Sequence, residues 1–93
     1  MSIFTSPFRT PTAETKTHEL KILPEYYAQV ISRNKLWELR KNDRDFKVGD
    51  TVILKEWTDE QEFTGREYRT TILYVFEGGK YGLAEGYCIF SIA

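Results

Sequence analysis

The residues best suited to chemistry lie in one stretch, from Lys35 to Asp50, which holds nine charged side chains and two aromatic ones. Successive side chains of an extended strand point to opposite faces. Three residues therefore share one face: Leu36, Glu38 and Arg40. Trp37 and Leu39 share the other face. We predict that one face packs and that the other binds a charged ligand.

Glu38 and Arg40 are two positions apart on one strand face, so they can pair with each other. A carboxylate held by an arginine accepts a hydrogen bond from the exocyclic amine of a base, and the remaining arginine donors suit a phosphate or a carbonyl oxygen. The alternative is a structural salt bridge, which at a surface stabilises by less than about 1 kcal/mol. The two uses are compatible, so we predict a base or ribose site around residues 35–41.

Further cations follow this strand in a segment rich in Asn and Asp, which is typical of a turn. Long cationic side chains there can reach a phosphate backbone, although a solvated loop would look the same. If the phosphate-bearing ligand is RNA, single-stranded RNA is favoured over duplex, because splayed bases can stack on exposed rings such as Trp57, Tyr26 or Tyr87, unless those rings belong to the core. The predicted binding residues are Lys35, Glu38, Arg40, Lys41, Asn42, Arg44, Lys21 and His18.

His18 and Cys88 are the remaining candidates for chemistry. Histidine suits a general base at neutral pH, but His18 shares a strand face with Leu20 and Ile22, which favours a partly buried side chain with a hydrogen-bond partner. Because Cys88 is the only cysteine, it cannot form an intramolecular disulfide, and a zinc cage is nearly excluded. A Cys–His nucleophilic pair is the least favoured use, and we expect neither a metal nor a cofactor.

Composition indicates one small folded domain. The chain has 93 residues, 41% of them hydrophobic and 15% aromatic, which argues against disorder. The net charge of -1 excludes a polycation, but residues 33–47 carry six basic side chains against three acidic ones. Glu56 to Glu62 carries four acids and no base. A local basic patch favours a phosphate-bearing ligand, with an ordinary mixed surface as the alternative.

The same sequence gives an expectation for the compartment. A single cysteine fits a reducing environment, and no stretch approaches the roughly 18 apolar residues of a membrane span. The N-terminus lacks the basic start and apolar run of a signal peptide. We therefore expect a cytoplasmic protein, monomeric and without a membrane partner.

Hydrophobic periodicity divides the chain into a flexible tail, residues 1–16, and a domain, residues 17–93. Alternation or apolar runs predict strands at Thr17–Ile22, 35–41, Thr51–Trp57, 66–76 and Tyr87–Ile92. Pro24 at a first helical position predicts a helix over 24–33. An acidic loop is expected over 58–65. This order favours an α+β fold in which five to six strands curl into a small barrel with the helix at one opening.

The ordered motifs resemble a known family. The string RKNDRDFKVGD, residues 40–50, combines with His18-x-Leu20-Lys21-Ile22, Tyr27, Thr64-Gly65 and Gly86-Tyr87. This pattern resembles the DUF3850 family of bacteria and their phages, within the ASCH group of the PUA-like superfamily, over about residues 17–92. The resemblance implies a PUA-like β-barrel that binds RNA or modified nucleotides.

The ASCH signature, Gly-x-Lys-x-x-Glu-x-Arg, is matched at Lys35, Glu38 and Arg40, whereas Arg33 takes the glycine position. Either Arg33 or Asn34 must then close the helix in a left-handed conformation, which asparagine tolerates better.

Three functions remain open. The first is RNA or nucleotide binding. The second follows from a resemblance to amidohydrolases that deacylate modified cytidines with a lysine, a threonine and a glutamate. Here Glu38 replaces the threonine, so catalysis would require Glu38 to activate water while Lys35 stabilises the developing charge. Binding is favoured over catalysis. The third is a protein-interaction module of phage or mobile-element origin that presents the acidic segment 56–62 to a basic partner.

Overall fold

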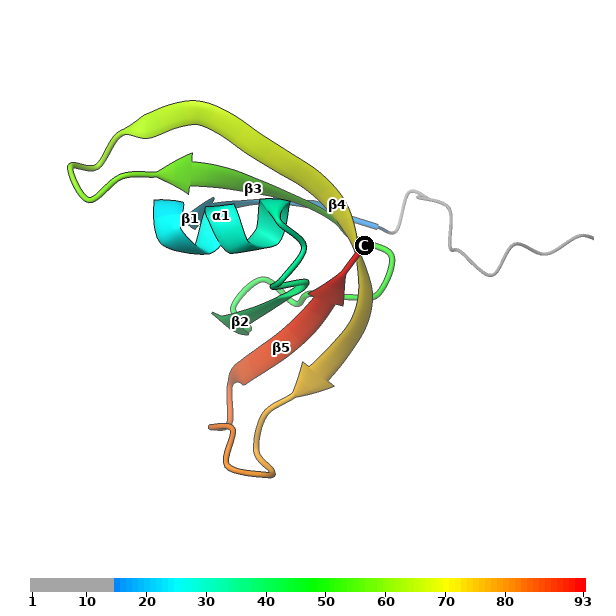
Figure 1. Ribbon diagram of the computed structural model, residues 1–93. Helices are drawn as coiled ribbons and strands as arrows, with labels where there is room; N and C mark the ends of the chain where they lie inside the picture. The colour runs from blue at the N-terminus through cyan, green and yellow to red at the C-terminus, as the bar shows by residue number, and fades with distance from the viewer. Residues whose placement is uncertain (1–14) are drawn as a thin grey trace, which may run out of the picture.

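A computed structural model describes residues 15–93, which form one helix and five strands (Figure 1). The elements are β1 (Thr17–Ile22), α1 (Pro24–Ile31), β2 (Trp37–Lys41), β3 (Thr51–Trp57), β4 (Phe63–Glu77) and β5 (Tyr87–Ile92). The protein is a small α+β domain. Of the predicted flexible tail, residues 1–14 lie outside the described part of the chain. Lys16, in contrast, is anchored, because its carbonyl accepts the N–H of Thr51.

All five strands belong to one mixed sheet with the order β1-β3-β4-β5-β2. β1 runs parallel to β3, and the other neighbouring pairs are antiparallel. The long strand β4 serves both halves of the sheet, since its first part pairs with β3 and its second part with β5. β4 curves strongly between them (Figure 1), and the register shifts between Ile72 and Tyr74. A bulge of this kind bends a strand and increases its twist.

The sheet is not closed, so strand pairing among the described residues does not make the predicted barrel. β1 and β2 are its two edges. Two arginine side chains connect these edges instead: Arg40 donates from Nη2 to the Lys21 carbonyl, and Arg44 donates from Nη1 to the Glu19 carbonyl, each at 2.9 Å. The unpaired carbonyls of an edge strand require partners. The arginines supply them without a strand-to-strand ladder.

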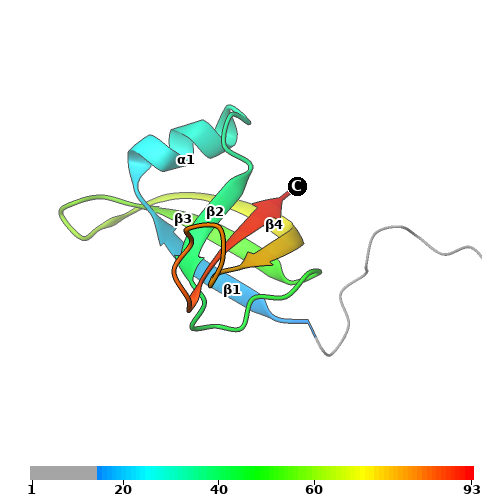
Figure 2. The same cartoon turned by 90° about the horizontal axis from the view of Figure 1, so that it is seen from below.

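The core lies inside the curved sheet and under α1, which lies along one side of the sheet in Figure 2. β1 alternates as predicted, with His18, Leu20 and Ile22 buried. β3 buries the consecutive run 52–54, which is typical of a strand covered on both faces. From α1, Tyr27 and Val30 are buried, whereas Ile31 is 49% exposed.

The helix ends two residues earlier than predicted, and its closure depends on Arg33. The last helical residue is Ile31, and Arg33 has a φ of 65°. Its N–H donates to the Val30 carbonyl, while the N–H groups of Asn34 and Lys35 both donate to the Gln29 carbonyl. Arg33 therefore takes the left-handed position for which asparagine was the better candidate. β4 also begins earlier than predicted, because Phe63 pairs with Trp57 across the hairpin.

Asp50 ties the beginning of the domain to the turn before β3. The residue is 1% exposed. Its Oδ1 accepts the Lys16 N–H, and its Oδ2 accepts the Lys47 N–H and lies 2.7 Å from Nε2 of His18. Burial alone would raise the pKa of Asp50, but the hydrogen bonds from His18, Lys16 and Lys47 outweigh burial and lower this pKa.

We predict that Asp50→Asn destabilises the domain by about 2–4 kcal/mol at pH 7, because the amide nitrogen cannot accept these hydrogen bonds. The folded pKa of Asp50 lies below its unfolded value, so its stabilisation is complete above about pH 3.9 and is lost as the pH falls through the folded pKa. Urea unfolding at pH 7 and at pH 3 measures both effects. Equal stability of the two proteins at pH 7 would contradict this role.

Arg33 gives a second prediction, because its backbone conformation favours glycine. Arg33→Gly should leave the free energy of unfolding unchanged or raise it by up to about 1 kcal/mol, since glycine adopts positive φ without strain. Arg33→Val should lower it by about 1 kcal/mol or more, because a β-branched residue is strained there. Thermal unfolding of both variants provides the measurement. A glycine variant less stable than the valine variant would show that the left-handed turn is not the constraint.

Candidate functional site

The carboxylate of Glu38 is buried and held by two cations. Glu38 is 3% exposed. Its Oε2 lies 2.5 Å from Nζ of Lys35, and its Oε1 accepts hydrogen bonds from Nε and Nη2 of Arg40 at 2.9 and 2.7 Å. Lys35 also donates to the Trp37 carbonyl at 2.8 Å. The three charges therefore form one connected cluster, and the predicted pairing of Glu38 with Arg40 is confirmed.

Strand pairing explains why Glu38 points inward. It is paired with Phe90 of β5, which is fully buried, so both side chains lie on the inner face of the sheet. The alternate residues Trp37 and Leu39 lie on the outer face and are 45% and 50% exposed. The charged face of β2 is thus the one that turns toward the protein interior, and its apolar face contacts solvent.

A pocket of about 430 Å³ opens beside this cluster, a volume typical of small-molecule sites. It is lined by Lys21, Ile22, Leu23, Tyr26, Lys35, Trp37, Glu38, Leu39 and Arg40. The ammonium of Lys35 lies 4.7 Å from the centre of the Trp37 ring and 5.9 Å from that of Tyr26. Apolar and aromatic walls thus surround a charged floor, an arrangement that suits a flat polar ligand.

Two further hollows continue along the gap between β1 and β2. The second, of about 360 Å³, is lined by Glu19, Leu20, Lys21, Arg40, Arg44, Lys55 and Phe63. Four of these side chains are cationic, and the only carboxylate is that of Glu19, which pairs with Lys55 at 3.1 Å. The third, of about 190 Å³, is lined by three cations and one carboxylate, together with two apolar residues: Arg40, Lys41, Arg44, Asp43, Leu20 and Phe46. Arg40 lines all three hollows, so they lie next to one another around its side chain.

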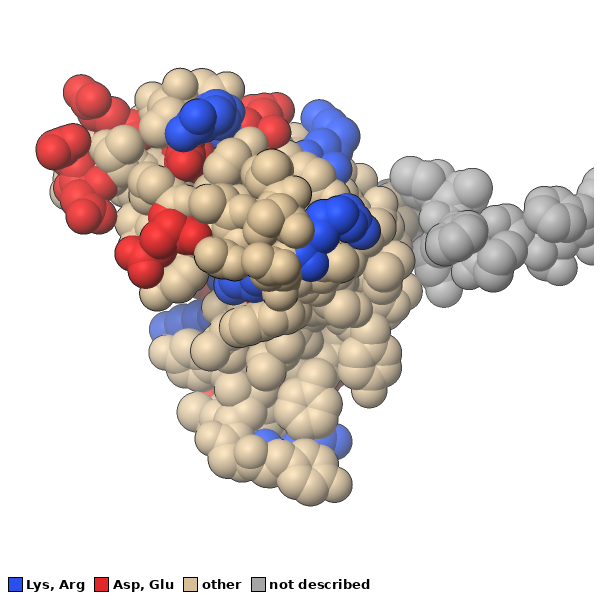
Figure 3. Space-filling view, viewed as in Figure 1, with Lys and Arg blue, Asp and Glu red and all other residues tan. Residues whose placement is uncertain are grey.

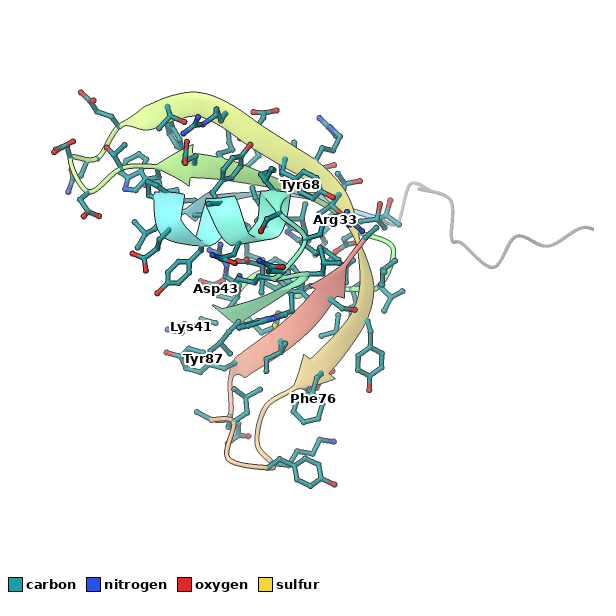
Figure 4. All side chains as sticks on the ribbon, viewed as in Figure 1. Arg33, Lys41, Asp43, Tyr68, Phe76 and Tyr87 are labelled. Carbon is teal, nitrogen blue, oxygen red and sulfur yellow. The ribbon has the colours of Figure 1, made fainter. Side chains whose placement is uncertain are left out.

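The structure brings together six of the eight predicted binding residues. Lys21, Lys35, Glu38 and Arg40 line the first pocket, and Lys41 and Arg44 line the third hollow. Lys41 is paired with Tyr87 of β5, and Figure 4 shows these two side chains close together.

Asn42 and His18 have structural contacts instead. Oδ1 of Asn42 accepts the Phe46 N–H at 3.0 Å, which shapes the turn after β2. His18 is 5% exposed, pairs with Asp50 and packs against the ring of Phe46. Neither residue lines the three hollows.

Sequence reasoning missed Lys55 and Phe63. Both come from the β3–β4 hairpin and reach the second hollow because β3 pairs with β1, where Lys55 lies opposite Lys21. The signal in the sequence was a lysine directly after the apolar run 52–54, but its use required knowledge of which strand lies next to β1.

The geometry gives little support to nucleophilic or hydrolytic chemistry. Burial, together with the charge of Glu77, raises the pKa of the Cys88 thiol, which keeps it protonated. Lys35 and Arg40 already donate three hydrogen bonds to the Glu38 carboxylate, so its oxygens are largely engaged and are not free to position a water molecule. Within residues 15–93, no three His, Cys, Asp or Glu side chains are grouped so that they could hold a metal ion. In the same range no helix is long and apolar enough to cross a membrane.

The fold and the site define a small α+β domain with a charged cavity between its two edge strands. The chain belongs to the family described as "Domain of unknown function (DUF3850)", which matches residues 17–92. It is also similar to the "Uncharacterized 12.9 kDa protein in GpA 3'region" of Escherichia phage P2, with 42% identity over 57 residues. These residues are 61% of this chain and 51% of the phage protein, so the chain spans about half of that relative's length.

The burial of Glu38 gives a third prediction. Glu38→Gln should reduce the free energy of unfolding by about 3–5 kcal/mol, because Lys35 and Arg40 lose the charge that neutralises them. Glu19→Gln is the matched control: its side chain is 61% exposed and pairs with one lysine, so its removal should cost less than about 1 kcal/mol. Chemical denaturation of both variants measures the difference. Equal losses would show that the Glu38 cluster behaves as a surface ion pair.

Proposed function

We propose that this protein binds single-stranded RNA, or a nucleotide, in the gap between β1 and β2. The observation that carries the proposal is the buried Glu38 carboxylate, held between Lys35 and Arg40 at the floor of an aromatic-walled pocket. Such a floor offers an acceptor and donors side by side. A nucleobase presents the complementary groups on one flat edge.

The pocket matches a base in both its polar and apolar parts. The rings of Tyr26 and Trp37 provide surfaces on which a base can stack. Oε2 of Glu38 can accept one further hydrogen bond, such as that of an exocyclic amine. Within residues 15–93, Nη1 of Arg40 makes no hydrogen bond and can donate to a base carbonyl or a ribose hydroxyl.

The two adjoining hollows suit the phosphates of the same ligand. Lys21, Lys55 and Arg44 surround the second hollow, and Lys41 adds a charge to the third. The guanidiniums of Arg40 and Arg44 are already fixed by carbonyls of β1, so binding immobilises them at little further cost in entropy. A base in the first pocket and a phosphate in the second would lie on either side of Arg40.

We also propose that the domain belongs to the ASCH group of the PUA-like superfamily, as a barrel-like variant. The support is the match of Lys35, Glu38 and Arg40 to the ASCH signature. Arg33 adds to it, because this residue takes the left-handed conformation where that signature has glycine.

A second candidate function uses another surface, the acidic hairpin between β3 and β4, whose charges gather at the upper left of Figure 3. The similarity to a phage protein fits a phage-derived module that contacts a basic protein. However, Glu56 is 2% exposed and bonds to Arg66 and Thr64, which lower its pKa, so it does not face a partner. The acidic side chains of the hairpin that are left to contact a basic partner are Asp59, Glu60 and Glu62.

The test of RNA binding uses a labelled single-stranded oligouridylate and fluorescence anisotropy. The double variant Lys21→Glu and Lys41→Glu should weaken binding at least about tenfold and reduce the dependence of affinity on salt, because phosphate contacts are lost. Neither lysine side chain donates a hydrogen bond within residues 15–93, and Lys21 loses a contact with the Trp57 ring, whose centre lies 3.8 Å from its ammonium, so the melting temperature should fall only slightly. The arginines are less suitable for this test because they also connect the edge strands.

Lys47→Glu is the matched control. Its side chain is 66% exposed, pairs with Asp45 at the surface and lines none of the three hollows. It should retain the affinity of the original protein. RNA binding that is unchanged in the double variant, or equally tight for a duplex of the same length, would overturn the proposed function.

A further inference from the structure

A second surface extends from the pocket over the outer face of β2, β5 and β4. Register places two rows of side chains there: Trp37, Ser91 and Tyr74 in one, and Leu39, Ile89 and Phe76 in the other. Tyr87, beside Lys41, continues the face at the end of β2. We call the side chains of Trp37, Leu39, Tyr74, Phe76, Tyr87 and Ile89 the outer sheet face.

The outer sheet face is apolar and open to solvent. Tyr74 is 62% exposed and Tyr87 is 43% exposed, in addition to the half-exposed Trp37 and Leu39, whereas Phe76 and Ile89 are partly buried and the Phe76 ring stacks with that of Tyr81. Bulky side chains of this kind gain free energy when they are covered. In Figure 3 the lower part of the molecule, which contains β5 and the end of β4, is largely uncharged, and the acidic side chains gather over the opposite hairpin. The face is therefore a candidate for binding, and its chemistry indicates the occupant.

We propose that the outer sheet face stacks the bases of a single-stranded nucleic acid that continues from the pocket. This inference rests on the proposed function. Four of the six side chains are aromatic rings, and rings on an open antiparallel sheet are a recurring platform for unpaired bases. Trp37 and Leu39 belong to the pocket lining and to this face, so one strand can pass from one to the other without leaving the protein.

Cations at both ends of the face fit a phosphate backbone. The ammonium of Lys35 lies over Trp37 at one end, and that of Lys80 lies 5.8 Å from the centre of the Phe76 ring at the other. Lys41 stands beside Tyr87. A docking site for an apolar protein surface would not require a lysine over these rings. The combination of ring faces and ammonium groups matches bases joined by phosphates.

The test compares a uridine dinucleotide, which occupies the pocket alone, with an octanucleotide, which can also cover the outer sheet face. Binding is followed by chemical-shift changes in the full-length protein. The octanucleotide should bind at least about tenfold more tightly than the dinucleotide. Tyr74→Ala and Tyr87→Ala should each reduce octanucleotide affinity at least about fivefold, because a stacking ring is removed, and leave dinucleotide affinity unchanged.

Ile31→Ala is the matched control, because Ile31 is an equally exposed apolar residue on α1, away from this face. It should affect neither ligand. Equal affinities for the two lengths, or a length effect that survives both tyrosine variants, would overturn the proposal that bases stack on the outer sheet face. Dinucleotide binding would still measure whether the pocket binds a nucleotide. If the original protein does not bind the dinucleotide, that result counts against the proposed function of the pocket. Self-association that Tyr74→Ala abolishes would assign the face to a second copy of the chain and overturn this inference.

Discussion

Burying a carboxylate beneath the surface of a protein is costly unless cations compensate for the water it has lost, and Glu38 has two such partners. Lys35 approaches one oxygen and Arg40 the other. Arg40 also donates to the Lys21 carbonyl, so one guanidinium both neutralises the acid of β2 and holds the edge of β1. The position of the second edge strand and the charge of the pocket therefore depend on the same side chain.

This arrangement explains why the sheet remains open and why it has space for a ligand. Direct pairing of β1 with β2 would satisfy the edge carbonyls but would fill the gap between the strands. Arginine side chains satisfy the same carbonyls across a wider separation and leave hollows on either side. The donors that stabilise the open edge are thus also the donors available to an anion. The structural role of these arginines coincides with the binding role proposed for them, so variants of the exposed lysines separate the two roles more cleanly.

Much of this architecture follows from local patterns in the sequence. The bounds of β1, β3 and β5 could be predicted from alternation and apolar runs, and the pairing of Glu38 with Arg40 from their spacing of two. The burial of Glu38 could not be predicted, because it depends on the pairing of β2 with β5. The position of Lys55 at the site could not be predicted either, because it depends on the register of β3 with β1. Local propensity favoured Asn34 for the helix closure, yet the backbone hydrogen bonds place Arg33 there.

The open sheet edge and the charged pocket both require the guanidinium of Arg40 to be fixed between Glu38 and the Lys21 carbonyl in the free protein. Nuclear magnetic resonance of the arginine side chains measures this directly. A fixed guanidinium gives an Nε–H that is protected from solvent exchange and separate Nη signals, because rotation about its C–N bonds is slow. We expect this behaviour for Arg40. A rapidly exchanging Nε–H with averaged Nη signals would show that the guanidinium is not fixed in the free protein.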